Sequence, residues 1–250
     1  MKICRYEYNN QTSFGKFEND LIFPVDNKNL NLLVDKEPIK FQDVRLLAPV
    51  APSKIVCVGR NYSEHAKELG NEVPKEPLLF LKAPSAIISE GDSIFLPEQS
   101  EQVEHEGELA AVIGRACKNL SETDNPFEYV SGYLCLNDVT ARDIQRKEIQ
   151  FTRAKSFDTF CPVSSFMETD LDVSDIRLTT KVNGVIKQDG RTSQMVFPVS
   201  FLIRYISNQM TLNAGDVIAT GTPSGVSKLN AGDICEVEIE GVGILRNAVE

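Results

Sequence analysis

The sequence predicts a mostly β protein of the α+β class, with few helices. From Leu78 onward, short apolar runs that are typical of strands follow one another, with turn residues between them. Asn183 and Gly184 join two of these runs, and this dipeptide is a strong signal for a β-hairpin. Helical signals occur in a short stretch after Asn61 and in residues 199–210, where four residues recur at helical spacing: Phe201, Leu202, Tyr205 and Ile206.

The composition is that of a soluble globular protein. Of the 250 residues, 25% are charged and 42% are hydrophobic, which is ordinary for such proteins. The formal net charge of −10 argues against a nucleic-acid partner, because proteins that bind the phosphate backbone normally carry a basic face. An anionic substrate would therefore need a local patch of Lys, Arg or metal to be attracted.

The cysteines and the apolar runs indicate a reducing compartment. The six cysteines form no CxxC pair, and several lie inside apolar runs, as Cys57 does in IVCVG and Cys135 in YLCLN. This pattern is typical of buried free thiols rather than of disulfides or a zinc site. The N-terminus has no apolar signal segment, and no stretch reaches the ~20 apolar residues that cross a bilayer. We expect a cytoplasmic protein without a membrane partner.

The chain divides into two predicted parts at a proline-containing segment. Residues 1–50 contain short strand-like runs with turns, which predicts a small β-rich N-terminal region. Pro49 and Pro52 follow in APVAPSK, and proline interrupts both helices and strand ladders. Residues 51–250 form the second, larger domain, which opens with the buried strand KIVCVG.

A short helix is predicted after that strand, in RNYSEHAKELG. Asn61 is placed as its N-cap with Glu64 in capping-box spacing, and Gly70 as the residue just beyond its C-terminus. A helix of two turns is marginal in water, so packing or a ligand must hold it and we expect it to be mobile. His65 and Glu68 lie at i and i+3, where the carboxylate would make the imidazole a better base. An exposed surface contact between the two is the alternative.

Three glutamates share one face of the strand-like run at residues 102–114, QVEHEGELAAVIG. Side chains two positions apart on a strand point the same way, so Glu104, Glu106 and Glu108 would repel one another. With Asp138, which ends the apolar run YLCLND, Glu106 and Glu108 would make an all-oxygen site for Mg²⁺ or Mn²⁺. A solvated strand edge with unrelated acids is the alternative, and Glu104 is interpreted as a surface acid where the strand starts.

Other polar residues add weaker signals. GTPSGV, residues 221–226, exposes backbone N–H groups and the Thr222 hydroxyl after a strand, which suits an anion or an ordinary turn. His105 lies on the face opposite the glutamates and is expected to be structural. Four cations recur beside the acidic segments, and they suggest an anion-binding pocket although each alone would be a surface charge: Arg60, Lys82, Arg142 and Lys155.

The order of the motifs resembles that of the fumarylacetoacetate hydrolase family. GRNYSEHAKE, LFLKAPS, HEGELAAVIG, GYLCLNDVTARDIQ, AKSFDTFCPVS, VNGVIKQDG and IATGTPSGV follow one another within residues 54–250. Residues 1–50 resemble the family's N-terminal region more loosely. The resemblance is closest to the small members that act as acylpyruvate hydrolases, oxaloacetate decarboxylases or isomerase/decarboxylases. It implies a rolled mixed β-sheet with few helices, a short lid helix and a homodimer.

The resemblance also implies roles for individual residues. The implied ligands of Mg²⁺ or Mn²⁺ are Glu106, Glu108 and Asp138. The implied catalytic residues, the first two of them a pair on the lid helix, are His65, Glu68 and Lys155. The residues expected to contact the substrate are Arg142, Gln145, Thr222 and, more weakly, Lys82.

The implied function is metal-dependent cleavage of a C–C bond in a small 2-oxo acid, by an acylpyruvate hydrolase, an oxaloacetate decarboxylase or an enzyme that does both. An isomerase/decarboxylase of unsaturated dicarboxylic 2-oxo acids is the alternative enzyme, and a second cationic pocket from Arg146 or Arg191 would favour it. A non-catalytic protein that binds a 2-oxo acid is the alternative from another class. The presence of His65 with Glu68 argues against it, because binding alone needs no base.

Overall fold

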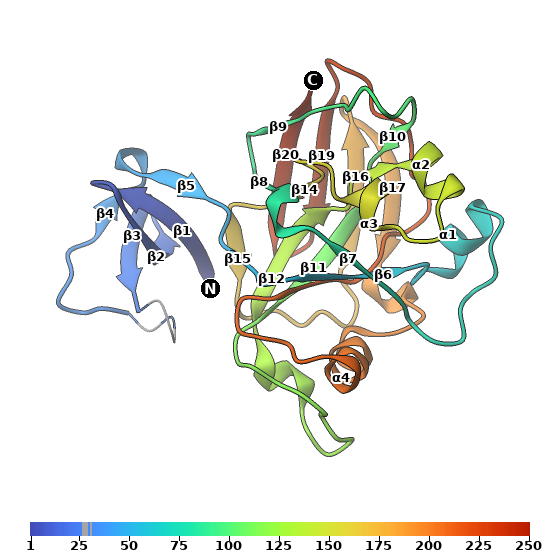
Figure 1. The fold of residues 1–250 in the computed structure, drawn as a ribbon. Coiled ribbons are helices and arrows are strands. Elements are labelled where there is room, and N and C mark those ends of the chain that lie inside the picture. Colours follow the sequence, from blue (N-terminus) through green and yellow to red (C-terminus); the bar gives the residue numbers. More distant parts are fainter. Residues whose placement is uncertain (27–29, 31) are drawn as a thin grey trace.

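The computed structural model describes residues 1–26, 30 and 32–250. Strands dominate, and most of them belong to a large mixed sheet or to a second sheet packed against it (Figure 1). This arrangement confirms the predicted mostly β fold. None of the helices in the described residues is long and apolar enough to cross a membrane.

The first five strands stand at one side of the molecule, in blue in Figure 1. Asn9 and Asn10 form a two-residue turn with positive φ, and Asn19 and Asp20 form another, as type I′ hairpins require. The first strand of this group also pairs with β15 (Phe166–Glu168), so the group extends the large sheet. The five strands are β1 (Lys2–Tyr8), β2 (Gln11–Glu18), β3 (Leu21–Val25), β4 (Ile39–Lys40) and β5 (Arg45–Leu47).

The large sheet continues from β15 into the main body. Most of its neighbours are antiparallel, but β18 pairs with β6, and β14 with β8, in parallel. Along its main path the order is β4-β3-β2-β1-β15-β12-β11-β18-β6-β7. The remaining strands are β6 (Ile55–Gly59), β7 (Leu78–Lys82), β8 (Ile87–Ser89), β11 (Gly107–Ile113), β12 (Val130–Asn137), β14 (Cys161–Val163) and β18 (Val217–Ala219).

The second sheet has the order β17-β16-β19-β20-β9. Its first hairpin turns at Asn183 and Gly184, both with positive φ, which confirms the hairpin predicted there. Its strands are β9 (Ser93–Ile94), β16 (Arg177–Val182), β17 (Val185–Arg191), β19 (Ile234–Ile239) and β20 (Gly243–Val249).

The strand β11 is the centre of the core. All its residues are buried, and alternate side chains enter two different apolar clusters. Leu109, Ala111 and Ile113 pack toward the second sheet, while Ala110 and Val112 pack on the opposite side. Burial on both faces explains why its sequence is almost continuously apolar. A strand held on both faces is a rigid base for the acidic residues at its start.

The helices are α1 (Ser63–Glu68), α2 (Arg142–Lys147), α3 (Thr152–Lys155) and α4 (Val199–Gln209). The sequence predicts α1 and α4 but neither α2 nor α3. The four residues that recur at helical spacing in α4 do not all face the core. Leu202 and Ile206 are buried, but Phe201 is 40% exposed and stacks on Phe197 and Tyr205, while Ile203 occupies a core position.

Candidate active site

Two antiparallel strands bring the three predicted carboxylates together. Gly107 at the start of β11 lies opposite Asn137 at the end of β12, and the backbone N–H of Asp138 donates to the carbonyl of Glu106 at 2.8 Å. One oxygen each from Glu106, Glu108 and Asp138 lies within 4.8 Å of the other two, and all three side chains are buried. The alternative of a solvated strand edge therefore does not describe this site.

The strand predicted over residues 102–114 is interrupted in the structure. β10 (Val103–Glu104) pairs with β13 (Thr140–Ala141) in a small separate sheet, and the large sheet resumes only at Gly107. A Cβ on Gly107 would lie 2.1 Å from Oγ1 of Thr180, so a larger side chain cannot occupy this point without a shift. The expected single strand with three glutamates on one face is therefore wrong, although Glu106 and Glu108 do meet.

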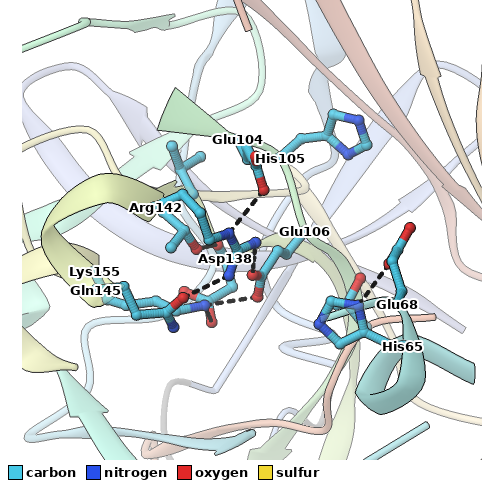
Figure 2. A network of polar contacts seen from close by, with 12 residues as sticks. His65, Glu68, Glu104, His105, Glu106, Asp138, Arg142, Gln145 and Lys155 are labelled. Carbon is cyan, nitrogen blue, oxygen red and sulfur yellow. Dashed lines mark hydrogen bonds and ion pairs between the residues drawn. The ribbon is translucent and has the colours of Figure 1, made fainter. Parts of the chain in front are cut away.

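Two buried lysines neutralise part of this acidic cluster, and Figure 2 shows one of them, Lys155. Nζ of Lys155 donates to Oε2 of Glu106 and to Oδ2 of Asp138, both at 2.6 Å. Nζ of Lys82 donates to Oδ1 of Asp138 at 2.7 Å and to the carbonyl of Val139 at 3.3 Å. Ammonium groups in a dry interior need such partners, because isolated buried charges are costly.

Glu106 and Glu108 differ in their protonation behaviour. Burial opposes ionisation of Glu106, but the facing charges of Lys155 and Arg142 outweigh it and lower the pKa of this carboxyl. Burial, followed by repulsion from Asp138 and Glu106, raises the pKa of Glu108 well above its usual range. Glu108 accepts the N–H of Gly221 at 2.7 Å, and no cationic side chain of the described residues forms an ion pair with it.

The carboxylates of Glu106, Glu108 and Asp138 (the carboxylate set) could hold a divalent cation. Its donors are all oxygens, which suits Mg²⁺ or Mn²⁺, and it contains no His or Cys, which zinc prefers. A dication among three buried acids would also relieve the repulsion that acts on Glu108. The residues present therefore fit the metal that the sequence predicts.

Arg142 is fixed by three contacts at the start of α2 (Figure 2). Its Nε donates to Oε2 of Glu104 at 2.7 Å, its Nη2 to Oε1 of Glu106 at 2.5 Å, and its Nη1 to Oε1 of Gln145 at 2.6 Å. Glu104 is only 7% exposed, so its interpretation as a surface acid is wrong. The reason lies in the fold: the β10–β13 pairing places Arg142, far along the chain, directly against it.

His65 and Glu68 meet on α1 as predicted. Nδ1 of His65 lies 3.0 Å from Oε2 of Glu68, and the other carboxylate oxygen of Glu68 accepts the N–H of Gly225 at 2.9 Å. His65 is buried, whereas the side chain of Glu68 is 32% exposed. The pair therefore differs from an ordinary surface contact, and it ties the short helix to the loop that follows β18.

The cap predicted for α1 is wrong at its N-terminus. Tyr62 occupies the N-cap position, and no side chain caps the helix there. The buried side chain of Asn61 instead accepts the N–H of Phe197 at 2.8 Å and donates to the carbonyl of Thr220 at 2.7 Å. Asn61 thus joins three segments of the fold. Gly70 follows the C-terminal end with a φ of +69°, in agreement with its predicted place.

The predicted site residues converge on one cavity of about 640 Å³. It opens between α1, α2 and the ends of β6, β7 and β11, and it also includes apolar side chains such as Leu78, Phe80 and Phe151. The predicted residues that line it are His65, Glu68, Glu106, Glu108, Asp138, Arg142, Gln145, Lys155 and Thr222. One cavity thus collects side chains from segments that are distant in the sequence.

Lys82 is the exception among the described residues predicted for the site. It does not line the cavity, and its fully buried ammonium group lies on Asp138. A direct contact with substrate, as predicted for Lys82, does not follow from this position. β7 places Lys82 behind the carboxylates, where it neutralises Asp138 from the side away from the cavity.

A buried network of hydrogen bonds connects His105 through Gln188 to Thr222 of the site. Nδ1 of His105 lies 3.2 Å from Oε1 of Gln188, and Nε2 lies 2.9 Å from the hydroxyl of Ser227. Burial lowers the pKa of His105 to about 4, so the ring is neutral at physiological pH. Gln188 in turn donates to Oγ1 of Thr222 at 2.7 Å. His105 is structural, as predicted, and the sequence carries no signal for the role of Gln188.

Two further arginines line the cavity. Arg60 follows β6 with a φ of +57°, which is uncommon for a residue other than glycine, and Nη1 of Arg146 donates to Oε1 of Gln102 at 3.0 Å. Within the described residues neither arginine has a carboxylate within 4.0 Å. Arg191, the other arginine considered for a second cationic pocket, lies elsewhere and pairs with Asp175.

Comparisons with known proteins bear on this site. Residues 54–250 match the family model described as fumarylacetoacetate (FAA) hydrolase C-terminal, and residues 1–49 match the model described as Rv2993c-like, N-terminal. The chain is 45% identical over 196 residues to the mitochondrial oxaloacetate decarboxylase of Dictyostelium discoideum, covering 76% of this chain and 89% of that protein. It is 42% identical over 202 residues to the mitochondrial oxaloacetate tautomerase FAHD1 of Bos taurus, covering 78% of this chain and 91% of that protein.

The fold also matches a solved structure along the whole chain. The crystal structure of 5-carboxymethyl-2-hydroxymuconate delta-isomerase from Mycobacterium smegmatis superposes with a TM-score of 0.91 at 40% sequence identity. The match covers 100% of this chain and 99% of that one.

Proposed function

The chain belongs to the fumarylacetoacetate hydrolase family, and on this premise we propose that it breaks a bond at C3 of a small 2-oxo acid with the help of Mg²⁺ or Mn²⁺. The observation that carries the proposal is that one cavity contains both a buried histidine hydrogen-bonded to a glutamate and an all-oxygen carboxylate set. Together they supply a base and a place for an electrophile. C–C cleavage, as decarboxylation or as hydrolysis, is the reaction that we propose first.

The base in this proposal is His65. Its Nδ1 faces Glu68, so the carboxylate holds the tautomer that leaves Nε2 free to accept a proton. Glu68 is itself held by the N–H of Gly225, which limits its movement. In hydrolysis of an acylpyruvate, His65 takes a proton from water, the hydroxide attacks the acyl carbonyl, and the C3–C4 bond breaks. The products are a carboxylic acid and the enolate of pyruvate, which takes the proton back from His65 at C3.

The carboxylate set supplies the electrophilic side of the proposed site. Glu106, Glu108 and Asp138 would hold the metal ion, which acts as a Lewis acid toward the oxygens of a 2-oxo acid. Lys155 lines the cavity and donates to both Glu106 and Asp138, and it would stabilise negative charge that develops on the substrate. Thr222 and Gln145 line the same cavity and would orient substrate oxygens.

Oxaloacetate is the first substrate that we propose. Its decarboxylation breaks the bond between C3 and the distal carboxylate, needs no water, and leaves the same enolate as hydrolysis does. Two relatives carry oxaloacetate in their names. The cavity adds a second reason, because Arg60 and Arg146 line it without a carboxylate partner among the described residues and could attract a second carboxylate.

A proton transfer without bond cleavage is the second candidate. The relatives include a protein named a tautomerase and a structure named an isomerase. The same cavity would serve, with His65 moving a proton at C3 instead of activating water. This candidate also suits a dicarboxylic 2-oxo acid, because Arg60 and Arg146, which have no carboxylate partner among the described residues, lie in the same cavity.

The test is a substrate panel with the purified full chain. Pyruvate release is measured from oxaloacetate and from short acylpyruvates, and the enol absorbance of oxaloacetate is followed in parallel, each with Mg²⁺, with Mn²⁺ and with EDTA. Metal-dependent pyruvate release supports cleavage, and enol decay without pyruvate release assigns the tautomerase reaction. Binding of these acids with no turnover of any of them would overturn the enzymatic proposal in favour of a binding protein.

We also propose that the protein is a homodimer, as the family resemblance implies. Light scattering on the eluate of a size-exclusion column measures the mass directly. A single species near the chain mass of 27.8 kDa would overturn this proposal.

A further inference from the structure

A buried acid outside the carboxylate set has no part in the chemistry proposed above. Glu104 is 7% exposed, and no face of its side chain lines the cavity. Its Oε2 accepts a hydrogen bond from Nε of Arg142 at 2.7 Å, and its Oε1 accepts a hydrogen bond from Nε2 of Gln102 at 2.6 Å. Burying a carboxylate is costly unless it is paired, so this contact with Arg142 decides where both groups lie.

Arg142 connects this acid to the carboxylate set. Its guanidinium is planar and rigid, so fixing Nε on Glu104 also fixes the direction of Nη2, which donates to Oε1 of Glu106 at 2.5 Å. Figure 2 shows the guanidinium between the two glutamates. The remaining arm, Nη1, is held by Gln145 at 2.6 Å. All three nitrogens are occupied, so Arg142 cannot turn without losing a buried contact.

The backbone holds this arrangement at both ends. Glu104 lies opposite Thr140 in the β10–β13 pair, and the N–H of Arg142 donates to the carbonyl of Gln102 at 2.7 Å. The two charged side chains therefore project from paired segments whose register is fixed. A pair of two-residue strands contributes little to the hydrophobic core, but the β10–β13 pair does set the positions of Glu104 and Arg142.

We propose that Glu104 is a positioning residue, which acts through Arg142 to orient the carboxylate of Glu106 and to limit how much of that carboxylate's charge Arg142 neutralises. Two acids share one guanidinium, so Glu106 keeps charge available for a cation in the cavity. Without the charge of Glu104, the positive charge of Arg142 would be paired with Glu106 alone, and Arg142 would compete with that cation for the carboxylate of Glu106. The proposal rests on the proposed function, because it assumes that the carboxylate set binds a divalent metal.

The test is Mn²⁺ affinity of the full chain without substrate, measured by calorimetry and by the electron paramagnetic resonance signal of free Mn²⁺. Outer partners of metal ligands typically change affinity about 10–100-fold, so Glu104→Gln is expected to raise the Kd for Mn²⁺ by that factor. Glu101→Gln is the matched control. Glu101 lies three residues before Glu104 in the sequence, and the substitution removes the same charge from an exposed side chain. It should leave the Kd unchanged.

A double-mutant cycle separates positioning from general damage. If Glu104 acts through Arg142, then Glu104→Gln should have no further effect on the Kd in an Arg142→Met background. A folded Glu104→Gln protein with the wild-type Kd would overturn the proposal, and so would an equal effect of Glu104→Gln in both backgrounds. If Glu104→Gln does not fold by circular dichroism, Gln102→Ala provides the milder test. It keeps the contact of Glu104 with Arg142 and removes the contact with Gln102, and it also removes the hydrogen bond from Arg146 to Gln102.

The outcomes also separate this proposal from the proposed function. If the wild-type protein turns over no 2-oxo acid but Glu104→Gln lowers its Mn²⁺ affinity, the role of Glu104 stands and the proposed reaction is overturned. If the wild-type protein shows metal-dependent turnover but Glu104→Gln leaves the Kd for Mn²⁺ unchanged, the reaction stands and the role of Glu104 is overturned. Wild-type protein that binds no Mn²⁺ would overturn both.

Discussion

At the scale of single residues, His65 is the side chain on which water activation depends. It is buried beside the cavity, and its Nδ1 is hydrogen-bonded to Glu68. General-base assistance is typically worth ~10²–10⁴ in rate, so His65→Ala should lower acylpyruvate hydrolysis by about that factor. Oxaloacetate decarboxylation needs no water and should fall less. Steady-state kinetics on both substrates measures the difference, with Mn²⁺ affinity as the control that should not change. Near wild-type hydrolysis would remove the assignment.

Lys82 gives a residue-scale prediction about stability. Its ammonium group is fully buried on Asp138, and breaking a buried ion pair by removing one partner typically costs about 3–5 kcal/mol. Lys82→Met should therefore lower the free energy of unfolding in urea by that amount. Lys67→Met is the matched control: Lys67 pairs with Glu64 on the exposed face of α1, and surface changes of this kind stay within about 0.5 kcal/mol. Equal effects of the two substitutions would contradict the structural role of Lys82.

How far single residues can be predicted depends on where their partners lie. The acids at 106 and 108 are evident from their alternation in a strand-like run, and the acid at 138 is evident because it ends an apolar run. Glu104 is misjudged as a surface acid, and the burial of Lys82 is not predicted, because the groups that pair with them, Arg142 and Asp138, come from distant segments. Asn61 has the right residue type for an N-cap, but contacts with Phe197 and Thr220 use its side chain instead. No local rule contains that information.

At the scale of elements, the loop after β18 restrains the lid helix. Gly225 has a φ of +104°, and a Cβ there would lie 1.9 Å from the carbonyl oxygen of Lys187. Its N–H holds Glu68. Gly225→Ala should therefore shift the loop, release Glu68 and lower the hydrolysis rate, and we expect the loss to approach that of Glu68→Ala. Steady-state kinetics together with the melting temperature measures the effect.

Gly215→Ala is the control for this prediction. Gly215 also has a positive φ, +88°, but a Cβ there meets no atom within 4 Å. This variant should show the stability cost of the strained backbone without the loss of activity. Equal activity in the two variants would show that the contact between Gly225 and Glu68 is unimportant.

Elements were predictable where a distinct local signal marks them. The hairpin follows from the Asn183-Gly184 dipeptide, α4 from helical spacing, and the lid helix from the residues expected at its two ends, although Asn61 does not cap it. The helices α2 and α3 span six and four residues, which is too short for a period to show. The break at His105 and Glu106 is also hidden, because glutamates continue at every second position through it. Tertiary pairing with β13, and not local preference, ends β10.

At the scale of the whole molecule, Asp216 joins the start of β6 to the start of β18. Its Oδ1 accepts the N–H and hydroxyl of Ser53 at 3.1 and 2.6 Å, and its Oδ2 pairs with Lys54. Burial opposes the ionisation of Asp216, but these contacts and the N–H of Asn213 outweigh it, so the pKa of Asp216 lies below its ordinary value.

The sign of the pH dependence follows from that lowered pKa. The stabilisation is complete above the ordinary carboxyl pKa of about 3.9, and it is lost as the pH falls through the lower pKa of the folded state. Asp216→Asn should cost about 1.5–3 kcal/mol at pH 7, and the difference from wild type should shrink toward pH 3. Urea unfolding across this range measures it. A difference that does not depend on pH would contradict the ionic contribution.

The six cysteines provide a second prediction for the molecule as a whole. All are buried and free, and burial raises the pKa of Cys4, Cys161 and Cys235 to about 12. The thiolate is the reactive form, so the native protein should not react with Ellman's reagent at pH 8, whereas the protein in guanidinium should release six equivalents. Rapid reaction of the native protein would contradict the packing around these residues.

The pairing of β1 with β15 has a consequence for any shortened form of the protein. Residues 1–49 match a separate family model, so an obvious truncation would remove them. The cut would leave Phe166, Met167 and Glu168 with unpaired N–H and C=O groups along one side of the large sheet. Such a free edge is a template for pairing with other chains. The N-terminal strands therefore also protect the protein against aggregation, and the shortened chain should precipitate or form oligomers through that edge.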